Sequence, residues 1–407
     1  MRARRVSTVA SIAVIALPGL LAMQLAGSQP LVPPRAPPTA PPVNVIFDTD
    51  IWSDIDDMLA LSMLNALHDR HEINLVAVTI STEDPWCATY VDLVDTFYGH
   101  PAIPIGIVHH GASLDVFRKK FPAVAWPVTR YTEMVSREKT GDGRSLYPHH
   151  LTDTSHVPDA VSLLRKTLAA QADSSVVMIQ VGYSTNLARL LDTPGDAVSP
   201  RTGRELVARK VRLLSVMAGN YGDAQFRGQR VPSGTPEFNL QVDVPAAQHV
   251  FSSWPTPIVA SGFEIGLSML YPGYSIAHDY SYVAHHPIAD TYRTYCEEQK
   301  AKDTAFGACP HDHPTFDLTA VLYGARPDRN YFSLSRPGRI TVLDDGSSRF
   351  DEFEGGTHRH LVLTEDEKAR ALEAMVMLAS QPPRDLRAEQ RTGGARETHP
   401  PDRRGTR

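Results

Sequence analysis

An acidic segment near residue 50 constrains the fold more than any other part of the chain. Five aspartates fall within residues 48–57, in the sequence VIFDTDIWSDIDDMLAL. The preceding segment, Val43 to Phe47, is apolar and β-branched, and the following one, Met58 to Leu67, is almost wholly apolar and long enough for a helix. This order predicts a strand, a loop and a helix, with the acids at the carboxyl end of the strand. Open α/β sheets bind their ligands at that end.

The density of negative charge in this loop calls for a positive partner. The acids are Asp48, Asp50, Asp54, Asp56 and Asp57. Carboxylates this close together repel one another unless a positive charge lies among them. A hard divalent cation held by oxygen ligands is the natural candidate.

Two simpler explanations account for the acidic loop less well. Ser53, Asp54 and Asp56 suit the first turn of a helix, whose free N–H groups attract acceptors, but capping explains only one or two of the acids. An EF-hand loop counted from Asp48 requires Gly at its sixth position and Glu at its twelfth. The chain has Ser53 and Leu59 there, so this explanation fails.

A phosphatase is the alternative enzyme. A strand that leads into Asp-x-Asp is typical of phosphatases that use the first Asp as nucleophile, here Asp48, and the second as acid, here Asp50. The late acidic pair of such an enzyme would be Asp344-Asp345, after the strand-like segment Arg339–Leu343. This chemistry also needs a Lys beside the phosphate, and no Lys lies at a suitable strand end. The phosphatase therefore stays the second choice.

Short apolar segments alternate with helical ones between residues 43 and 262. The strand candidates are Val43–Phe47, Leu75–Ser81, Ile103–Val108, Val176–Val181, Val211–Met217 and Pro257–Ser261. The helical candidates between them include Ala88–Tyr98, Ala160–Ala172 and Thr185–Leu191. This alternation predicts a single α/β domain with a mostly parallel sheet and helices on both faces.

The later part of the domain has a weaker pattern. Residues 265–340 are rich in His, Tyr and Pro and predict loops over the site. Beyond them, Arg339–Leu343 and His360–Leu363 are typical of a β-hairpin, and Glu365–Leu378 of a final helix.

The two ends of the chain differ from its middle. Residues 1–28 combine three Arg near the start with an apolar run, which indicates a signal peptide or an N-terminal anchor. Residues 29–42 are rich in Pro and predict a linker, and residues 381–407 predict a disordered tail. The catalytic domain is then residues 43–380. We expect a secreted or periplasmic protein, with membrane anchoring as the alternative.

Charge and cysteine content limit the partners. The net charge of −6 gives no basic surface for a nucleic-acid polymer. Of the three Cys, residues 296 and 309 could form a disulfide in an exported protein, which would leave Cys87 as a lone buried thiol.

Four segments, in order along the chain, resemble the nucleoside hydrolase family, the calcium-dependent N-ribohydrolases typified by inosine–uridine-preferring enzymes. They are the DTD and DD motifs of residues 48–57, QVGYSTNLA at 180–188, PEFN at 236–239 with Asp243 and the Ala pair at 246–247, and DLTAV at 317–321. Glu-Phe-Asn is the most specific of these pieces. The resemblance spans roughly residues 43–330 and implies the family's α/β fold.

The resemblance implies a Ca²⁺ site. Asp50 matches the acid that both contacts the calcium and serves as general base. Asp57 matches a bidentate ligand, and Asp317 matches the late ligand. Val181 matches a residue that binds through its backbone carbonyl, so its apolar side chain is no obstacle.

The resemblance also implies a ribose site. Asp56 and Asn239 match groups that hold the 2′- and 3′-hydroxyls, and Glu237 matches one that holds the 5′-hydroxyl. A pair of capping residues in an ordinary loop is the alternative for Glu237 and Asn239. Asp48 resembles a carboxylate that orients the loop, and Asp54 has no counterpart.

The chemistry of the reaction agrees with these residue types. Cleavage of an N-glycosidic bond develops positive charge on the sugar, as in an oxocarbenium ion. A carboxylate-rich cavity stabilises that charge. A bound cation lowers the pKa of its water, and Asp50 would remove the proton.

The chain departs from the family where the leaving group is activated. Well-studied members have a His, as general acid, immediately before the late Asp, and this chain has Phe316. Aromatic stacking on the leaving base is one substitute, with Phe316 as a substrate-binding residue and Trp52, Trp86 and Tyr183 as further candidates. A loop His, at 311 or 313, is the other. Trp52 also replaces the Gly usual in the acidic loop.

The sequence thus predicts a Ca²⁺-dependent hydrolase of nucleosides or related N-ribosides. The base specificity stays open, and so does the oligomeric state, a homo-oligomer included. A ribose-binding protein that has lost turnover is the non-enzymatic alternative.

Overall fold

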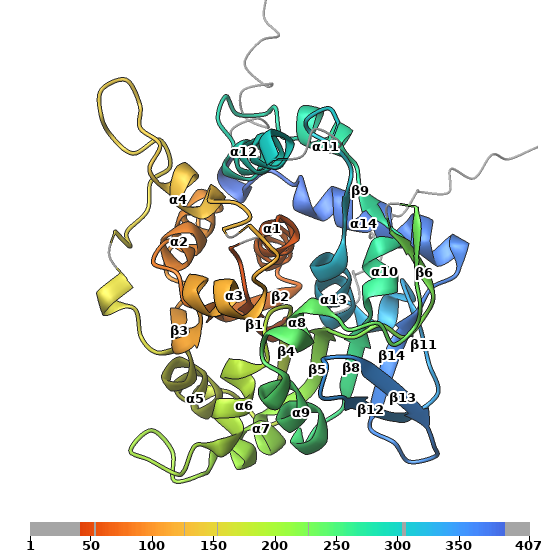
Figure 1. Ribbon diagram of the computed structural model, residues 1–407. Helices are drawn as coiled ribbons and strands as arrows, with labels where there is room; N and C mark the ends of the chain where they lie inside the picture. The colour runs from red at the N-terminus through yellow and green to blue at the C-terminus, as the bar shows by residue number, and fades with distance from the viewer. Residues whose placement is uncertain are drawn as a thin grey trace, which may run out of the picture. The chain divides into compact units, whose positions relative to one another are not determined.

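The computed structural model describes residues 41–386 except 53, 126, 153, 227 and 303–306 (Figure 1). The predicted signal or anchor, nearly all of the linker and the last 21 residues of the predicted tail (387–407) lie outside this range. Gln381, at the start of that tail, is buried and accepts a hydrogen bond from Nε of Arg70, so the folded part reaches at least this residue. Within the described part of the chain no helix is both long and apolar enough to cross a membrane.

The centre of the fold is a large, mostly parallel sheet, as the alternation of segments predicts. Its strands, in spatial order, are β13 (Ser348–Glu352), β12 (Gly338–Val342), β14 (His358–Val362), β8 (Ile258–Ser261), β5 (Val211–Met217), β4 (Val176–Gln180), β1 (Val43–Thr49), β2 (Ile73–Thr82) and β3 (Ile105–Ala112). The pairs from β14 to β3 are parallel, whereas β12 pairs antiparallel with both β13 and β14. Strand β11 (Ser333–Leu334) adds an antiparallel partner to β14.

Helices cover both faces of this sheet. The α-helices among the described residues are α1 (Asp56–Asp69), α2 (Cys87–Phe97), α3 (Leu114–Lys120), α4 (Tyr131–Ser136), α5 (Ala160–Ala170), α6 (Thr185–Asp192), α7 (Gly203–Lys210), α8 (Phe238–Val242), α9 (Val244–Ser253), α10 (Phe263–Leu267), α11 (Gly273–His278), α12 (Pro287–Lys302), α13 (Phe316–Ala325) and α14 (Glu365–Ala379). Two short antiparallel pairs, β6 (Ala224–Phe226) with β7 (Gln229–Val231) and β9 (Leu270–Tyr271) with β10 (His313–Pro314), lie outside this sheet.

The apolar strands divide their side chains between two cores, because successive residues of a strand point to opposite faces. Val45 and Phe47 of β1 join the core beneath α1, α2, α13 and α14, whereas Ile46 joins the core beneath α5, α6, α7 and α9 (Figure 1). A strand buried on both faces reads as a continuous apolar run rather than an alternating one. This explains why β1 precedes the acidic loop as an unbroken apolar segment.

The strand order reverses between β1 and β4. From β1 the chain proceeds through β2 to β3 on one side, and from β4 through β5 to β8 on the other. The loops after β1 and β4 therefore leave the sheet in opposite directions and open a crevice between them, where α/β sheets bind ligands. The acidic loop follows β1, and Val181 follows β4.

The prediction of loops over residues 265–340 is wrong in part. Helices α10, α11, α12 and α13 occupy much of this region. Within α12, Ile288, Tyr292 and Tyr295 are buried at helical spacing. Charged and polar residues at the remaining positions hide this stripe in the sequence, since four successive residues read as Glu-Glu-Gln-Lys.

The late hairpin also differs from its prediction. The antiparallel partner of β12 is β13, with Ile340 opposite Phe350, and β14 lies instead parallel to β8. Strand β13 escaped detection because its sequence, Ser-Arg-Phe-Asp-Glu, is mostly exposed at the edge of the sheet. The final helix, α14, forms where expected.

The disulfide expected between Cys296 and Cys309 is present, with a Cα–Cα distance of 5.8 Å. It ties α12 to the segment that leads into β10. Cys87 is buried and free, also as expected.

A buried carboxyl between α1 and α2 predicts a pH-dependent stability. Asp95 is 1% exposed and accepts a hydrogen bond from Asn65 at 2.8 Å, while its Oδ2 has no partner among the described residues. Burial raises the pKa of Asp95 to about 8. The pKa of Asp95 is higher in the folded state than in the unfolded state. The free energy that this carboxyl contributes to folding is therefore complete below about pH 4 and is lost as the pH rises through about 8.

Asp95→Asn should therefore raise the melting temperature at pH 8.5 and change it little at pH 5, since the amide keeps an acceptor for Asn65 and carries no charge. Thermal unfolding at the two pH values measures this, with Asp115→Asn at a 95% exposed side chain as the control. An equal shift at both pH values would contradict a titrating Asp95.

Candidate active site

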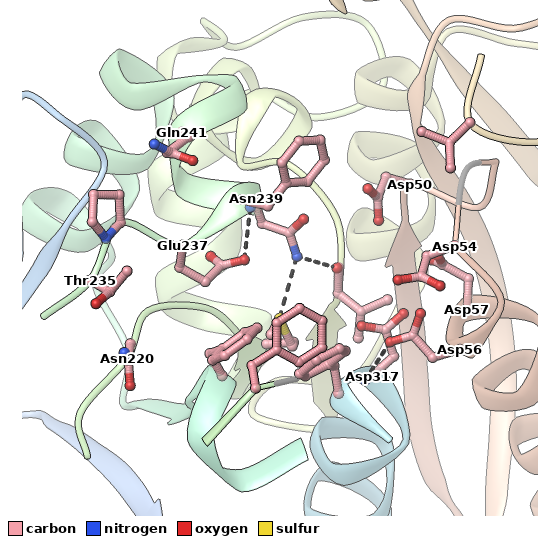
Figure 2. A pocket seen from close by; sticks show the side chains of 18 of the residues that line it. Asp50, Asp54, Asp56, Asp57, Asn220, Thr235, Glu237, Asn239, Gln241 and Asp317 are labelled. Atoms are coloured by element: carbon pink, nitrogen blue, oxygen red, sulfur yellow. Dashed lines mark hydrogen bonds between the residues drawn. The ribbon is translucent and has the colours of Figure 1, made fainter. Parts of the chain in front are cut away.

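A cavity of about 400 Å³ lies where the loops after β1 and β4 meet (Figure 2). One part of its lining is polar and consists of Asp50, Asp54, Asp56, Asp57, Glu237, Asn239 and Asp317 together with several uncharged polar side chains. The other part is apolar and includes Met217, Phe226, Val231, Pro236, Phe238, Phe263 and Phe316. The residues that the resemblance assigns to the metal, the base and the ribose, Val181 included, therefore line one cavity together with Phe316, although they come from separate segments.

Three carboxyls of the cavity lining lie close together. The oxygens of Asp56, Asp57 and Asp317 lie within 4.8 Å of one another, and each residue is at most 4% exposed. Helix α1 begins at Asp56, and α13 places Asp317 in its first turn, where its backbone N–H donates to Asp56 at 3.2 Å. The hydroxyl of Thr49 donates to Asp57. Two helix starts thus bring acids from distant parts of the sequence together.

The electrostatics of this group suit a bound cation. Burial, reinforced by the neighbouring carboxylates, raises the pKa of Asp57 and Asp317 well above the usual range. Burial likewise raises the pKa of Asp56 to about 7. A divalent cation would favour the charged forms, and an all-oxygen donor set is the type that Ca²⁺ and Mg²⁺ prefer. The residues present therefore fit a metal centre.

Asp50 and Val181 lie in the same cavity. Asp50 is not a member of the group of three, but its side chain is 8% exposed and points into the cavity (Figure 2). Burial raises the pKa of Asp50 to about 8, and the charges on Asp56 and Glu237 act in the same direction. The carbonyl of Val181 accepts a hydrogen bond from Nδ2 of Asn239 at 2.7 Å, which leaves its second lone pair for another partner.

Glu237 caps a helix, which is the alternative role that the sequence suggested for it. Its carboxylate accepts from the backbone N–H groups of Asn239 at 2.8 Å and Leu240 at 3.2 Å at the start of α8. The same carboxylate lines the cavity and is 5% exposed, and its burial raises its pKa to about 7. Capping and contact with a ligand are compatible, because a carboxylate has about four lone pairs.

Asp48 lies beneath the site rather than in it. Its Oδ1 accepts from Thr79 at 2.5 Å and from Asn186 at 2.8 Å, and the residue is 1% exposed. It therefore links β1 to β2 and α6 and does not line the cavity.

This position disagrees with the phosphatase alternative. A nucleophile must reach its substrate, and Asp48 does not. The late acidic pair Asp344-Asp345 follows β12, which is separated from β1 by β14, β8, β5 and β4, and it lines a different cavity.

Aromatic rings form part of the apolar wall. Phe316 stacks on Phe263, with ring centroids 5.0 Å apart, and Phe263 contacts Phe226 edge to face at 6.2 Å. Phe316 was a candidate from the sequence, but Phe226 and Phe263 were not. They lie on β6 and at the start of α10, and no motif connects them with Phe316 along the chain.

The other proposed aromatic residues do not line the cavity. Trp52 is buried and stacks on Phe117 at 5.1 Å, and Trp86 packs against the guanidinium of Arg137. Tyr183 is fully buried beneath the site. The indole of Trp52 thus packs in the hydrophobic core and does not line the ligand cavity.

The two loop histidines also lie outside the lining. Nδ1 of His311 lies 3.1 Å from Sγ of Cys296, and Nε2 of His313 lies 2.9 Å from Oδ1 of Asp54. Asp54 additionally accepts from the hydroxyl of Tyr295 at 3.1 Å. Asp54, which has no counterpart in the family's motif, thus connects the cavity with the buried His313.

Comparisons with known proteins agree with this architecture. Solved structures with the same fold include a purine-preferring ribonucleoside hydrolase from Gardnerella vaginalis (17% identity, TM-score 0.59, covering 83% of this chain and 98% of that one). A plant nucleoside hydrolase matches with 17% identity and a TM-score of 0.59 over 84% of this chain and 100% of that one. An inosine-uridine preferring nucleoside hydrolase from Bacillus anthracis matches with 15% identity and a TM-score of 0.56 over 83% and 99% of the two chains.

A search of curated protein sequences found no match. The family model of inosine-uridine preferring nucleoside hydrolases, in contrast, matches residues 45–379, which is most of the chain and includes the acidic loop and the other segments that line the cavity. The chain therefore belongs to the inosine-uridine preferring nucleoside hydrolase family, whose members are N-glycosyl hydrolases.

Proposed function

We propose that this chain hydrolyses the N-glycosidic bond of ribonucleosides or related N-ribosides in a Ca²⁺-dependent reaction, with Asp50 as the general base. The observation that carries the proposal is the convergence of Asp50, Asp57, Val181 and Asp317 on one cavity, together with Asp56, Glu237 and Asn239. The experiment that tests it is release of free ribose from a nucleoside, with Asp50→Asn as the inactive comparison.

The metal ligands in this proposal are Asp50, Asp57, Asp317 and the carbonyl of Val181. The mutual approach of Asp57 and Asp317 and their raised pKa values support a cation between them. Ca²⁺ bound there would lower the pKa of a coordinated water. Its preference for six to eight oxygen ligands suits a site with several carboxylates and a carbonyl.

Asp50 would remove the proton from the attacking water. Burial raises the pKa of Asp50, whereas a bound cation would favour its charged form, which is the form that accepts a proton. The remaining carboxylates would stabilise the positive charge that develops on the sugar.

The sugar hydroxyls would be held by Asp56, Asn239 and Glu237. Asn239 is positioned by its bond to the carbonyl of Val181, and Glu237 by the backbone of α8. These contacts fix both side chains before a substrate binds. Holding the ribose with C1′ over the water can supply several kcal/mol of the reduction in barrier.

Aromatic stacking by Phe316 is the leaving-group contact that the geometry favours. Phe316 lines the cavity next to the ligand Asp317, whereas His311 and His313 do not line it. Phe316→Ala should lower kcat/KM by about 1–3 kcal/mol, or roughly 5- to 150-fold, because the ring's contact with the base is lost.

Phe316→His should raise activity on inosine by supplying an acid beside the leaving group. His311→Ala and His313→Ala serve as controls on inosine and on p-nitrophenyl riboside. A His variant that loses more than ~10²-fold on inosine alone would place the general acid in the loop instead.

We further propose that the protein is exported through residues 1–28, which lie outside the described range, and that residues 29–42 and the C-terminal residues flank one catalytic domain. The arginines and the apolar run near the start support export. Mass spectrometry of the mature protein's N-terminus, from the cell envelope or medium, measures this. An uncleaved N-terminus in the cytoplasm would contradict it.

A further inference from the structure

A second cavity, of about 470 Å³, lies at the C-terminal ends of α1 and α13, where these helices pack against α14. Both helices begin at the group of carboxyls formed by Asp56, Asp57 and Asp317. Helix α1 has 14 residues and α13 has 10. At 1.5 Å per residue, their far ends are about 15–20 Å from that group. The two cavities have no described lining residue in common, so this is a separate site.

Four arginines dominate the lining of the second cavity, which we call the arginine cavity. They are Arg70 at the end of α1, Arg326 at the end of α13, Arg329 of the 3₁₀-helix η3 (Pro327–Arg329) and Arg370 of α14. Glu373 in the lining and Glu72, which pairs with two of the arginines, offset two of these charges. The group therefore keeps two positive charges in excess, although the whole chain has a net charge of −6.

The innermost guanidinium is held in place before any ligand binds. Arg326 is 7% exposed and contacts Glu72 through two parallel hydrogen bonds, at 2.8 Å from Nε and 2.7 Å from Nη2. Its Nη1 lies 3.4 Å from the hydroxyl of Tyr331. Among the described residues these contacts use three of its five N–H donors, which leaves two for another acceptor.

Positive charge dominates the field around Glu72. Burial alone would raise the pKa of Glu72, but the neighbouring guanidiniums of Arg326, Arg329 and Arg70 hold this pKa below its usual value. Arg329 also donates to the carboxylate, at 3.1 Å. One buried carboxylate thus serves as the common partner of several cations and does not neutralise them all.

Stabilisation of helix ends explains part of this arrangement. Arg70 and Arg326 lie at the C-terminal ends of their helices, where partial negative charges attract cations. Arg370 lies inside α14 instead, and it donates to the carbonyl of Asn330 from across the cavity. Helix-end stabilisation therefore does not account for Arg370 or for the open volume between the arginines.

One face of α14 gives the arginine cavity an apolar wall. The residues that it contributes follow the spacing of a single helical stripe, and they are Arg370, Glu373, Ala374, Met377 and Leu378. Leu378 is 1% exposed, whereas Met377 is 57% exposed. A long apolar side chain is thus left open to solvent beside a cluster of guanidiniums.

We propose that the arginine cavity binds a phosphate monoester that carries an apolar group. Such an ester has a charge of about −2 at neutral pH, which matches the excess of two positive charges. The planar fork of a guanidinium fits two phosphate oxygens at once. The apolar group of the ester would lie against Met377 and Ala374 and remove their surface from water.

Isothermal titration calorimetry of the full chain, loaded with Ca²⁺ and freed from excess ion, tests this proposal. Phenyl phosphate is the probe, because it joins a dianion to an apolar ring and contains no ribose. Inorganic phosphate tests the anion alone, and phenol tests the ring alone. At pH 8 phenyl phosphate should bind at one site with a Kd below about 1 mM, at least ~10-fold more tightly than either partial probe.

Arg370→Gln localises the binding, since Gln suits an exposed position in a helix and removes the charge. It should raise the Kd for phenyl phosphate by about tenfold or more. Arg349→Gln is the matched control, at an Arg on β13 whose side chain is 60% exposed and paired with Asp351. This control should bind phenyl phosphate as the wild type does.

Met377→Gln tests the apolar wall. It should raise the Kd for phenyl phosphate roughly 3- to 10-fold and leave the Kd for inorganic phosphate unchanged. Equal affinity of wild type and Arg370→Gln for phenyl phosphate would overturn the site, as would the absence of binding up to ~10 mM. Equal affinity of the wild type for phenyl phosphate and inorganic phosphate would overturn the apolar group of the ligand.

Discussion

Asp50→Asn should lower kcat/KM on any confirmed riboside by at least ~10³-fold. The substitution removes the general base, which alone is worth about 10²–10⁴-fold, and weakens a metal ligand at the same time. Asn is nearly isosteric with Asp, and the carboxyl is buried at a raised pKa, so the fold should tolerate the change. Steady-state kinetics with saturating Ca²⁺ measures the loss.

The matched control for this prediction is Asp344→Asn. Asp344 is an acidic residue that lines a separate cavity and was a candidate only under the phosphatase alternative. It should retain wild-type kinetics. An Asp50→Asn enzyme within tenfold of wild type would remove Asp50 from the mechanism.

Removal of metal should abolish turnover and lower the melting temperature together. In the metal-free protein Asp56, Asp57 and Asp317 remain buried within 4.8 Å of one another, where burial and the neighbouring carboxylates disfavour their charged forms. Binding of Ca²⁺ to the folded state alone would add about 2.7 kcal/mol of stability at a concentration of 100 Kd. Chelation followed by titration with Ca²⁺ should therefore restore activity and melting temperature with the same midpoint.

Asp317→Asn tests whether the loss of activity and the fall in melting temperature have the same cause. It removes one charge from the group, so it should raise the melting temperature of the metal-free protein while weakening the response to Ca²⁺. A chelated wild-type sample that keeps full activity would contradict a metal-dependent reaction. If Mg²⁺ restored activity and Ca²⁺ did not, the bound ion would be Mg²⁺ rather than Ca²⁺.

The parts of the site that are local in sequence could be predicted from it. The strand β1, the acidic loop and α1 follow one another within 27 residues, from Val43 to Asp69, and each has its own pattern of residues. The resemblance to a family added the distant members, Val181, Glu237, Asn239 and Asp317. The structure brings all of them to the same cavity.

Features created by tertiary packing could not be predicted in this way. Phe263 and Phe226 meet Phe316 only because α10 and β6 fold back over the cavity, and no sequence spacing records that contact. Trp52 was a candidate for stacking on the leaving base, but its ring packs on Phe117 of α3 instead. The burial of α12 was hidden because its exposed residues dominate its composition.

Asp54 shows how a residue without a counterpart finds a structural role. It contacts His313 and Tyr295, which lie on β10 and α12, in the region that the sequence predicted to be loops. The disulfide at Cys296 holds the same two segments together. Contacts with β10 and α12 therefore hold the acidic loop in place, and the sequence of the loop does not predict these contacts.

Hydrolysis of p-nitrophenyl riboside by the full-length protein tests the central claim most directly, because this substrate requires an intact sugar site, metal and base but no leaving-group acid. We expect Ca²⁺-dependent release of nitrophenolate and ribose by the wild type and at least a ~10³-fold loss in Asp50→Asn. A protein that is stabilised by Ca²⁺ and ribose yet releases no nitrophenolate would contradict the account and identify the chain as a ribose-binding protein.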